Sequence, residues 1–526
     1  MKEIKGGLSA VFAKLLQLFF GAHDVSTAGF SAELASGRRI CIWLDMGPVI
    51  ADESAQHVLY GAKGAAGLKP CLLCCNVFNR RFRADTIADA DTGGWSVQHT
   101  EHDASKFVLQ TEDTLGVIIN RLAVPMSKAN REAMQTNFGW NHVPDGIMHC
   151  GDMLQHVHPV THVCFDWMHV FFVSGIFNAT LMCVASALQP FGVTWQALDT
   201  YCSAWNLPHR LKYSFKISEV FTRGRVAKSK EAGTYKTTAS EGLVLLEVLS
   251  CFMHAIVAGS RSEEVKKHAR CFLLLAYTVE LLQRAARVRV TGREYLAAAS
   301  RFLKAFRETY GVDWMTPKCH SCLHFATFLD RWGILPNCFV LERKHRFPKR
   351  WANAQVNTSS SYEGAVLRSC TAHHLEVLAH GDTFATAAAL VEGSPAKGKV
   401  AKTLVETFGN NIGVCNVSQK ARISEFEVVH VGDLCLLSSA EGEPHRFVLI
   451  QYLLQQVDVP GSVPLALVRV YTAAEEQPRS WKLAAAAGDE ATLVPCCDIT
   501  TALIWTEGGA GRLQAVKPFW LQDAPF

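Results

Sequence analysis

Apolar positions recur with a helical spacing through the middle of the chain, from Phe165 to Tyr310. Long runs rich in Leu, Ala, Arg and Glu follow Ser260 and Thr291, and each of these two residues has a glutamate three positions later, which is the spacing of a helix capping box. The pattern predicts a large all-α block over residues 166–310.

Shorter elements are predicted upstream of this block. Residues 38–45 form a β-branched and aromatic run that ends before a Gly-Pro pair, which is typical of a buried strand. Asp52 begins a predicted helix that continues to Tyr60. A glycine-rich turn over residues 61–67 then leads to a pair of cysteines.

The pattern changes again towards the C-terminus. Residues 393–420 begin with a Gly-, Ser-, Pro- and Lys-rich stretch that is typical of a linker. Beyond it, short alternating strands separated by turn residues predict a small β-barrel or SH3-like module over residues 421–526.

Two apolar segments have features of targeting or membrane sequences. Residues 8–20 follow a lysine-bearing start, but Lys14 interrupts the run and no small-residue cleavage site follows, so an amphipathic helix is predicted rather than a signal peptide. Residues 170–198 carry no charge and are long enough to cross a bilayer. They contain several polar residues and no basic cluster flanks them, so we expect a buried helix and no membrane partner.

Composition limits the class of protein. A chain of 526 residues exceeds what one hydrophobic core usually supports, so at least two domains are expected. The hydrophobic fraction of 49% and the charged fraction of 19% exclude a disordered chain. The net charge of +4 is too small to identify a nucleic-acid-binding protein by itself. Eighteen irregularly spaced cysteines favour a reducing compartment over secretion.

Cys71 and Cys74 have the Cys-x-x-Cys spacing of half a zinc site. The stretch that follows residue 148 is rich in candidate ligands, and we favour Cys150 or His149 together with His156 or His158 to complete the site. The alternative is that the two cysteines are buried and act as small apolar groups.

Asp166 ends a short apolar run and precedes an apolar helix, with His169 one helical turn further on. That position can direct a carboxylate into a cleft, as a two-metal nuclease requires of several acidic residues. The alternative is that Asp166 caps the helix at its N-terminus.

The densest basic run of the chain lies near residue 345 and suits contacts with DNA phosphates, although a solvated helix face has the same composition. Its candidate DNA-binding residues are Arg343, Lys344, Arg346, Lys349 and Arg350.

Taken in order, these segments resemble the landmarks of eukaryotic cut-and-paste transposases of the CACTA (En/Spm-like) kind. The similarity covers roughly residues 38 to 355. Its motifs are the segment from Asp52 to Cys74, the Asp-Trp-Met-His of residues 166–169, Lys318-Cys319-His320 with His324, Arg331-Trp332-Gly333, and Phe339-Val340-Leu341-Glu342-Arg343-Lys344-His345. The last of these is the most specific.

The resemblance implies an α+β fold in which a ribonuclease-H-like core is interrupted by the all-α insertion and followed by a small C-terminal β-barrel (SH3/BAH-like) module. The implied parts are an N-terminal half of the core with the cysteine knuckle, the insertion, the C-terminal half of the core, a linker and the barrel, over residues 1–165, 166–310, 311–392, 393–420 and 421–526.

The resemblance also implies catalytic roles. Asp166 and Glu342 would bind Mg²⁺ or Mn²⁺, and His169 would orient an acid or contact the scissile phosphate. Either Asp52 or Asp45 takes the place of the family's first aspartate, or that strand is lost. Glu241 is a reserve carboxylate.

Two functions follow as alternatives. The chain is either a metal-dependent transposase that cleaves and transfers DNA strands, or a degenerate or domesticated, N-terminally truncated relative. The relative would be catalytically inactive and stabilised by structural Zn²⁺, and it would bind DNA, or chromatin through its C-terminal module. They differ in whether a third carboxylate reaches Asp166 and Glu342. A DNA substrate implies a nuclear protein, with the cytoplasm as the alternative; the oligomeric state is not encoded in any motif.

Overall fold

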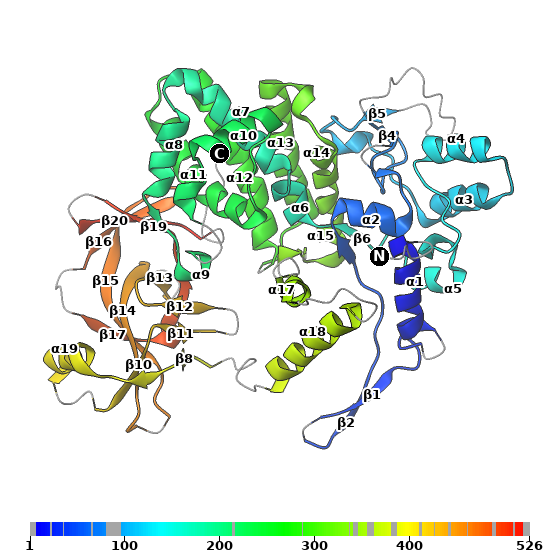
Figure 1. Ribbon diagram of the computed structural model, residues 1–526. Helices are drawn as coiled ribbons and strands as arrows, with labels where there is room; N and C mark the ends of the chain where they lie inside the picture. Colours follow the sequence, from blue (N-terminus) through cyan, green and yellow to red (C-terminus); the bar gives the residue numbers. More distant parts are fainter. Residues whose placement is uncertain are drawn as a thin grey trace. The chain divides into compact units, whose positions relative to one another are not determined.

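The computed structural model describes the chain apart from residues 1–6, 22–23, 35, 65–66, 80–95, 213–215, 287, 336, 340–345, 355–361, 380–386, 410–412, 425–426, 440–442, 460, 487–490, 509–510 and 519–526. The chain forms two units (Figure 1). The knuckle unit comprises Met1–Val184, Gly233–Ala239 and Tyr277–Phe339, and the sheet unit comprises Ala185–Ala232, Ser240–Ala276 and Val340–Phe526. Helices and strands both contribute, which confirms the α+β class.

The knuckle unit consists of helices with a few short strands. Its elements up to α6 are α1 (Gly7–Phe20), β1 (Phe30–Glu33), β2 (Arg39–Ile42), β3 (Val49–Ala51), α2 (Glu53–Tyr60), β4 (Val77–Phe78), β5 (Val97–Gln98), α3 (Glu112–Ala123), α4 (Lys128–Phe138), α5 (Gly151–Leu154), β6 (Val163–Phe165) and α6 (Trp167–Phe172). Its later helices are α13 (Gly292–Tyr310), α14 (Pro317–Ser321) and α15 (Phe325–Trp332). Three described helices contribute to both units: α7 (Ile176–Leu188), α12 (Glu263–Arg284) and, through its first residue alone, α11 (Ala239–Gly259).

Two parallel strands place two aspartates at the same end of a two-stranded sheet in the knuckle unit. β3 pairs with β6 in the register Val49↔Val163 to Ala51↔Phe165. The next residue along each strand is Asp52 or Asp166, and each begins a helix, α2 or α6, as its N-cap. Aspartate is favoured there because its side chain accepts hydrogen bonds from the first free backbone N–H groups of the helix.

The α13 and α15 helices pack closely at Gly292. A Cβ atom at this position would lie 2.2 Å from the carbonyl oxygen of Ala326. The backbone N–H of Gly292 donates to Asp330 Oδ1 at 2.7 Å. Glycine therefore permits the approach of the two helices that carry the C-terminal part of this unit.

Among the described residues, two segments are long and apolar enough to cross a membrane, by length and composition only: Trp167–Phe191 and Ala239–Gly259. The first is 78% buried inside the protein over its most apolar window. It is also divided, since α6 ends at Phe172 and α7 begins at Ile176.

The sheet unit joins helices to a large antiparallel sheet. Its helices are α8 (Trp195–Ser203), α9 (His209–Lys212), α10 (Arg223–Ala232), α11 (Ala239–Gly259), α17 (Arg346–Ala354), α18 (Tyr362–Ala379) and α19 (Gly398–Phe408). Its strands are β7 (Trp205–Asn206), β8 (Ala389–Val391), β9 (Ser394–Pro395), β10 (Cys415–Ser418), β11 (Lys420–Arg422), β12 (Val428–His430), β13 (Leu434–Leu437), β14 (Arg446–Gln456), β15 (Leu465–Glu476), β16 (Ser480–Ala485), β17 (Thr492–Pro495), β18 (Ile499–Ala502), β19 (Trp505–Glu507) and β20 (Leu513–Val516).

Eleven of these strands form one sheet, with the main order β18-β13-β14-β15-β16-β20-β19-β7, and β12-β11-β8 form a second. The β14 and β15 strands are the longest and pair from Arg446↔Thr472 to Leu454↔Leu465. Their inward side chains contribute to three buried apolar clusters. Adjacent residues such as Phe447 and Val448 are both buried but belong to different clusters, so apolar side chains on both faces of these strands form the core of the C-terminal module.

The expected linker over residues 393–420 is not a linker. It contains β9, α19 and β10, and β10 pairs with β14 through Val417↔Leu454. Leu404 and Cys415 are buried in one cluster with Leu454 and Leu467. Apolar side chains therefore anchor this segment in the sheet unit. The linker prediction was wrong because it relied on the Gly- and Lys-rich composition at the start of the segment.

The predicted separation of the helical insertion from the C-terminal module is also wrong, because a strand of the insertion belongs to the module's sheet. The β7 strand lies between α8 and α9, within residues 166–310, yet it pairs with β19 through Trp205↔Thr506. The predicted buried strand over residues 38–45 exists as β2, but among the described strands it pairs with β1 alone, and Trp43 beside it is 59% exposed.

Candidate metal centre

The Cys-x-x-Cys segment folds as a compact loop, the knuckle, defined here as residues 71–75. The backbone N–H of Leu73 donates to Cys71 Sγ at 3.3 Å. The carbonyl of Leu73 accepts from the N–H of Gln110 at 2.8 Å. His57 forms a hydrogen bond with the backbone of Pro70, immediately before the knuckle. These contacts fix the loop with both thiols directed to one side.

The facing residues come from the other end of the knuckle unit. His320 lies on α14, and His324 ends the short 3-10 helix η9 (Cys322–His324) that continues from it. Residues four apart in such a helical run project from the same face. His320 and His324 are therefore presented together, and their ring centroids lie 4.8 Å apart.

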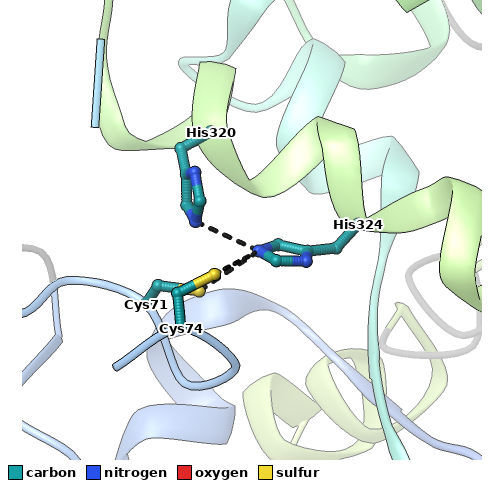
Figure 2. Close-up of side chains that lie close together, drawn as sticks. All are labelled: Cys71, Cys74, His320 and His324. Atoms are coloured by element: carbon teal, nitrogen blue, oxygen red, sulfur yellow. Dashed lines mark hydrogen bonds between the residues drawn. The ribbon is translucent and has the colours of Figure 1, made fainter. Parts of the chain in front are cut away.

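The four side chains converge (Figure 2). Nε2 of His324 lies 3.3 Å from Cys71 Sγ, 3.5 Å from Cys74 Sγ and 3.0 Å from Nε2 of His320. All four ligand atoms lie within 4.8 Å of one another. Tetrahedral Zn²⁺ with bond lengths of about 2.0 to 2.3 Å separates its ligands by roughly 3.3 to 3.8 Å, a range that contains both distances from His324 to the cysteine sulfurs.

Burial and charge also fit a metal ion. The four residues are between 1% and 8% exposed. Burial raises the pKa of Cys71, but the Cys74 hydrogen bond and the imidazoles of His324 and His320 outweigh it and hold that pKa well below the usual range. Burial and the neighbouring Cys71 raise the pKa of Cys74. Burial lowers the pKa of His320, which favours the neutral ring that binds metals.

A Cys₂His₂ set of this kind is typical of structural zinc. With four protein ligands, no coordination position is left for water or substrate. Nδ1 of His320 is buried and, within the described part of the chain, has no hydrogen-bond partner, whereas its Nε2 faces the other three ligands. A buried group of four soft and borderline donors thus fits Zn²⁺.

The predicted pair Cys71 and Cys74 therefore belongs to a group that could bind a metal, but its partners differ from the expected ones. Cys150 accepts from Gln17 Nε2 at 3.6 Å, His149 packs edge-on against His142, and His156 stacks on Phe20. Two of these three contacts are with α1, and the structure does not bring any of the three residues to the cysteine pair.

His320 and His324 were part of a motif in the sequence but were not assigned to the metal. The signal that identifies them is the spacing itself, because Cys-x₂-Cys with His-x₃-His is a common set of zinc ligands. Because about 250 residues separate the two halves, the sequence alone did not combine them into one set of ligands. Proximity along the chain favoured the wrong histidines.

A second feature is the aspartate edge, defined as Asp52 and Asp166 at the neighbouring ends of β3 and β6. Asp52 accepts a hydrogen bond from Ala55 N at 2.6 Å. Asp166 is 1% exposed, and both of its oxygens are occupied. Its Oδ1 accepts from Met168 N and Cys338 N, and its Oδ2 accepts from His169 N and lies 2.5 Å from Nδ1 of His169.

The expected pairing of Asp166 with His169 is therefore present, and so is the alternative role of Asp166 as a helix cap. Glu342 lies outside the described residues, as do Arg343 and Lys344. The chain that leads to them is attached to the aspartate edge, because Cys338 N donates to Asp166 and Phe339 packs against Trp167 at 5.5 Å between ring centroids.

Glu53 and Lys318 interact with groups of the two sites: Glu53 with Asp52 and Cys71, and Lys318 with Glu53 and Asp52. Burial raises the pKa of Glu53 to about 7, with a further contribution from Cys71, and Glu53 also forms a hydrogen bond with Ser321. Burial lowers the pKa of Lys318, although Glu53 and Asp52 oppose that shift.

The other sequence candidates belong to the sheet unit. Lys349 and Arg350 are exposed on α17, and the Arg350 guanidinium lies over the Trp351 ring, 5.6 Å from its centroid. Arg346 belongs to the same helix, but its side chain lies outside the described ones. Glu241 is 7% exposed and pairs with Arg225 at 2.6 Å, so its contacts are structural.

In the part of the chain that the structure describes, the Cys/His cluster is the one group of three or more His, Cys, Asp or Glu that could share an ion. No match was found in comparisons with protein-family models, with curated proteins or with solved structures. Conclusions about function therefore depend on the geometry of the metal centre and of the aspartate edge.

Proposed function

We propose that the protein is a transposase-derived DNA-binding protein whose Cys71, Cys74, His320 and His324 bind a structural Zn²⁺. The observation that carries the proposal is the convergence of two landmarks, the Cys-x-x-Cys segment and the Lys-x-His segment with its second histidine, in one buried site. The transposase resemblance contains both landmarks as separate motifs. Their meeting in space supports a common origin better than either motif alone.

The proposed core is ribonuclease-H-like. In support of it, β3 and β6 are parallel neighbours that end at Asp52 and Asp166, and a helix follows each strand. The eleven-stranded sheet would extend the SH3/BAH-like module proposed for the C-terminus, which would contact chromatin in the nucleus.

DNA contact is assigned to the basic helix α17. Lys349 and Arg350 are exposed, and no ion pair with an acidic residue is found for either among the described residues. Each cation that neutralises a phosphate releases counterions, so the affinity for DNA falls as salt rises. Such contacts give affinity without sequence preference.

The test is fluorescence anisotropy with a labelled duplex over a range of salt concentrations. The double variant Lys349→Ala/Arg350→Ala should bind more weakly, and the slope of log K against log salt should fall by about 2, or about 1 per phosphate contact. The matched control is Lys397→Ala/Lys399→Ala, which removes two exposed charges near α19 in the same unit. Equal loss in both variants would contradict the assignment to α17, and no binding by the unmodified protein would overturn the proposed function.

A second candidate function, divalent-metal-dependent DNA cleavage, is favoured by the aspartate edge. The register of β3 and β6 puts Asp52 and Asp166 at neighbouring strand ends, and Cys338, four residues before Glu342, donates a hydrogen bond to Asp166. Carboxylates are the ligands that Mg²⁺ and Mn²⁺ prefer. Glu53 follows Asp52 directly, and Asp166 would have to release His169 or a backbone N–H to bind an ion.

Calorimetry with Mn²⁺ distinguishes the two candidates. An active site predicts Mn²⁺ binding that Asp52→Asn and Glu342→Gln each abolish and that Asp45→Asn, a change at an exposed aspartate on the same segment, leaves intact. Metal-dependent nicking of DNA should then show the same pattern. Absence of Mn²⁺ binding in a zinc-loaded, folded protein would leave the DNA-binding function alone.

A further inference from the structure

The α14 helix contacts the metal centre and both helices of the aspartate edge. It has only five residues, and three of them point to different partners. His320 faces the cysteines, Lys318 reaches α6, and Ser321 forms a hydrogen bond with Glu53 at the start of α2. One short element thus connects the zinc ligands to both helices that the aspartates begin.

Lys318 closes the end of α6. Its Nζ donates to the carbonyl of His169 at 3.0 Å and to that of Val173 at 2.5 Å. The last carbonyls of a helix lack intrahelical donors, and a cation there also interacts favourably with the helix dipole. A six-residue helix is too short to be stable alone, so α6 depends on contacts at both ends. Asp166 supplies the first contact and Lys318 the second.

The α14 helix contacts α2 as well as α6. Glu53 is the first residue of α2 and follows Asp52 directly. Its carboxyl group bonds with Ser321 and lies close enough to Lys318 for the two charges to affect each other. A displacement of α14 would therefore disturb both helices at once.

We infer that Lys318 is a positioning residue through which zinc binding at His320 fixes the conformation of α6 and, with it, the aspartate edge. The inference depends on the metal centre of the proposed function and is independent of DNA binding. Zinc holds His320, His320 holds α14, and Lys318 on α14 holds the C-terminal end of α6. Loss of zinc would release α14 and weaken the protection of α6.

The experiment is amide hydrogen exchange with mass spectrometry on the full chain, zinc-loaded and after chelation, with the zinc content of each sample measured. In the unmodified protein, chelation should speed exchange in the peptide over residues 165–173 by about 5- to 150-fold, the usual range of coupling between two sites. In Lys318→Met the same peptide should exchange fast in both states, while zinc still protects the knuckle. Lys304→Met, at an exposed lysine of α13, should behave as the unmodified protein does.

The effect of zinc on exchange in the α6 peptide distinguishes a positioning role of Lys318 from a role limited to stability. A role limited to stability would speed exchange in Lys318→Met but preserve the difference between loaded and chelated samples, and that result would overturn the inference. Lys318→Arg keeps a donor and should restore the difference. If Lys318→Met does not fold, Lys318→Arg and the unmodified protein still decide the outcome, because an unmodified α6 that is indifferent to chelation overturns the coupling. A chain that binds no zinc would overturn the metal centre itself.

Discussion

At the scale of single residues, Asp52 and Asp166 occupy equivalent positions but differ in their surroundings. Both follow a strand and begin a helix, and the sequence alone predicts either as a helix cap. Asp166 is buried and accepts from three backbone N–H groups and pairs with His169, whereas the Asp52 side chain, among the residues described, accepts from Ala55 N alone. The number of contacts, which depends on the distant residue Cys338, was not predictable from local sequence.

Replacement of the two aspartates should therefore have unequal effects on stability. Asp166→Ala leaves buried N–H groups and His169 without their acceptor and should cost about 3 to 5 kcal/mol, as for a broken buried pair. Asp52→Ala removes one cap and should cost about 1 kcal/mol. Urea unfolding followed by circular dichroism measures both. Equal losses would mean that the contacts of Asp166 contribute no more than an ordinary cap.

Glu53 should make stability depend on pH. Its pKa is raised by burial to about 7 from 4.5, so the folded state holds the proton more tightly than the unfolded state. The stabilisation is complete below about pH 4.5 and is lost as the pH rises through 7, by about 3 kcal/mol in total. Glu53→Gln should therefore be more stable than the unmodified protein at pH 8, with the difference decreasing towards pH 5.

The control for this measurement is Glu132→Gln on α4, an exposed glutamate of the same unit. It should leave the pH profile unchanged. If Glu53→Gln gains no stability at alkaline pH, its carboxyl group is solvated and the proposed desolvation is absent.

At the scale of elements, local sequence patterns predicted those helix starts and caps that depend only on neighbouring residues. The α2 helix spans Glu53–Tyr60 with Asp52 as its cap, as expected, and Thr291 caps α13 by accepting from Glu294 N at 3.2 Å. Ser260 is not the cap of α12, since that helix begins at Glu263. The metal centre needs two elements that are far apart in the chain, so local sequence predicted its cysteine half, whereas the histidine spacing could be assigned to the site only once the fold brought the two halves together.

The metal centre predicts a zinc content of one per chain. Cys74→Ser and His324→Ala should each lower the bound zinc, measured by plasma mass spectrometry after gel filtration, and should lower the melting temperature. Cys150→Ser and Cys75→Ser should leave the bound zinc and the melting temperature unchanged, because Cys150 contacts Gln17 and Cys75 donates to the Val108 carbonyl. Zinc loss in Cys150→Ser with retention in His324→Ala would restore the ligand set first expected.

At the scale of the whole chain, the two units do not follow the order of the sequence. The knuckle unit combines residues before 185 with residues 277–339, and the sheet unit includes β7 from the middle of the helical block. The helical block and the run of C-terminal strands were predicted from their periods. The pairing of β7 and β10 into the sheet was not, because two to four residues carry no periodic signal.

The C-terminal module should therefore not fold when it is produced with the predicted bounds, residues 421–526. Residues 421–526 alone lack β8, β9, β10 and α19, and with them Leu404 and Cys415, which are buried in one cluster with Leu454 and Leu467. A chain of residues 387–526 keeps these elements and should show a cooperative thermal transition by circular dichroism, which the shorter chain should lack. Cooperative unfolding of residues 421–526 would contradict the role assigned to α19 and β10.

The metal centre also constrains the order of events during synthesis. Its ligands are separated by about 250 residues, so the site cannot be complete until His324 has left the ribosome. At about 5 to 20 residues per second, Cys71 and Cys74 wait roughly 10 to 50 s for their histidines. During this time the two thiols form only half a site and are open to oxidation or to other metals. Zinc loading is then a late step, after much of the sheet unit's helical part has already been made.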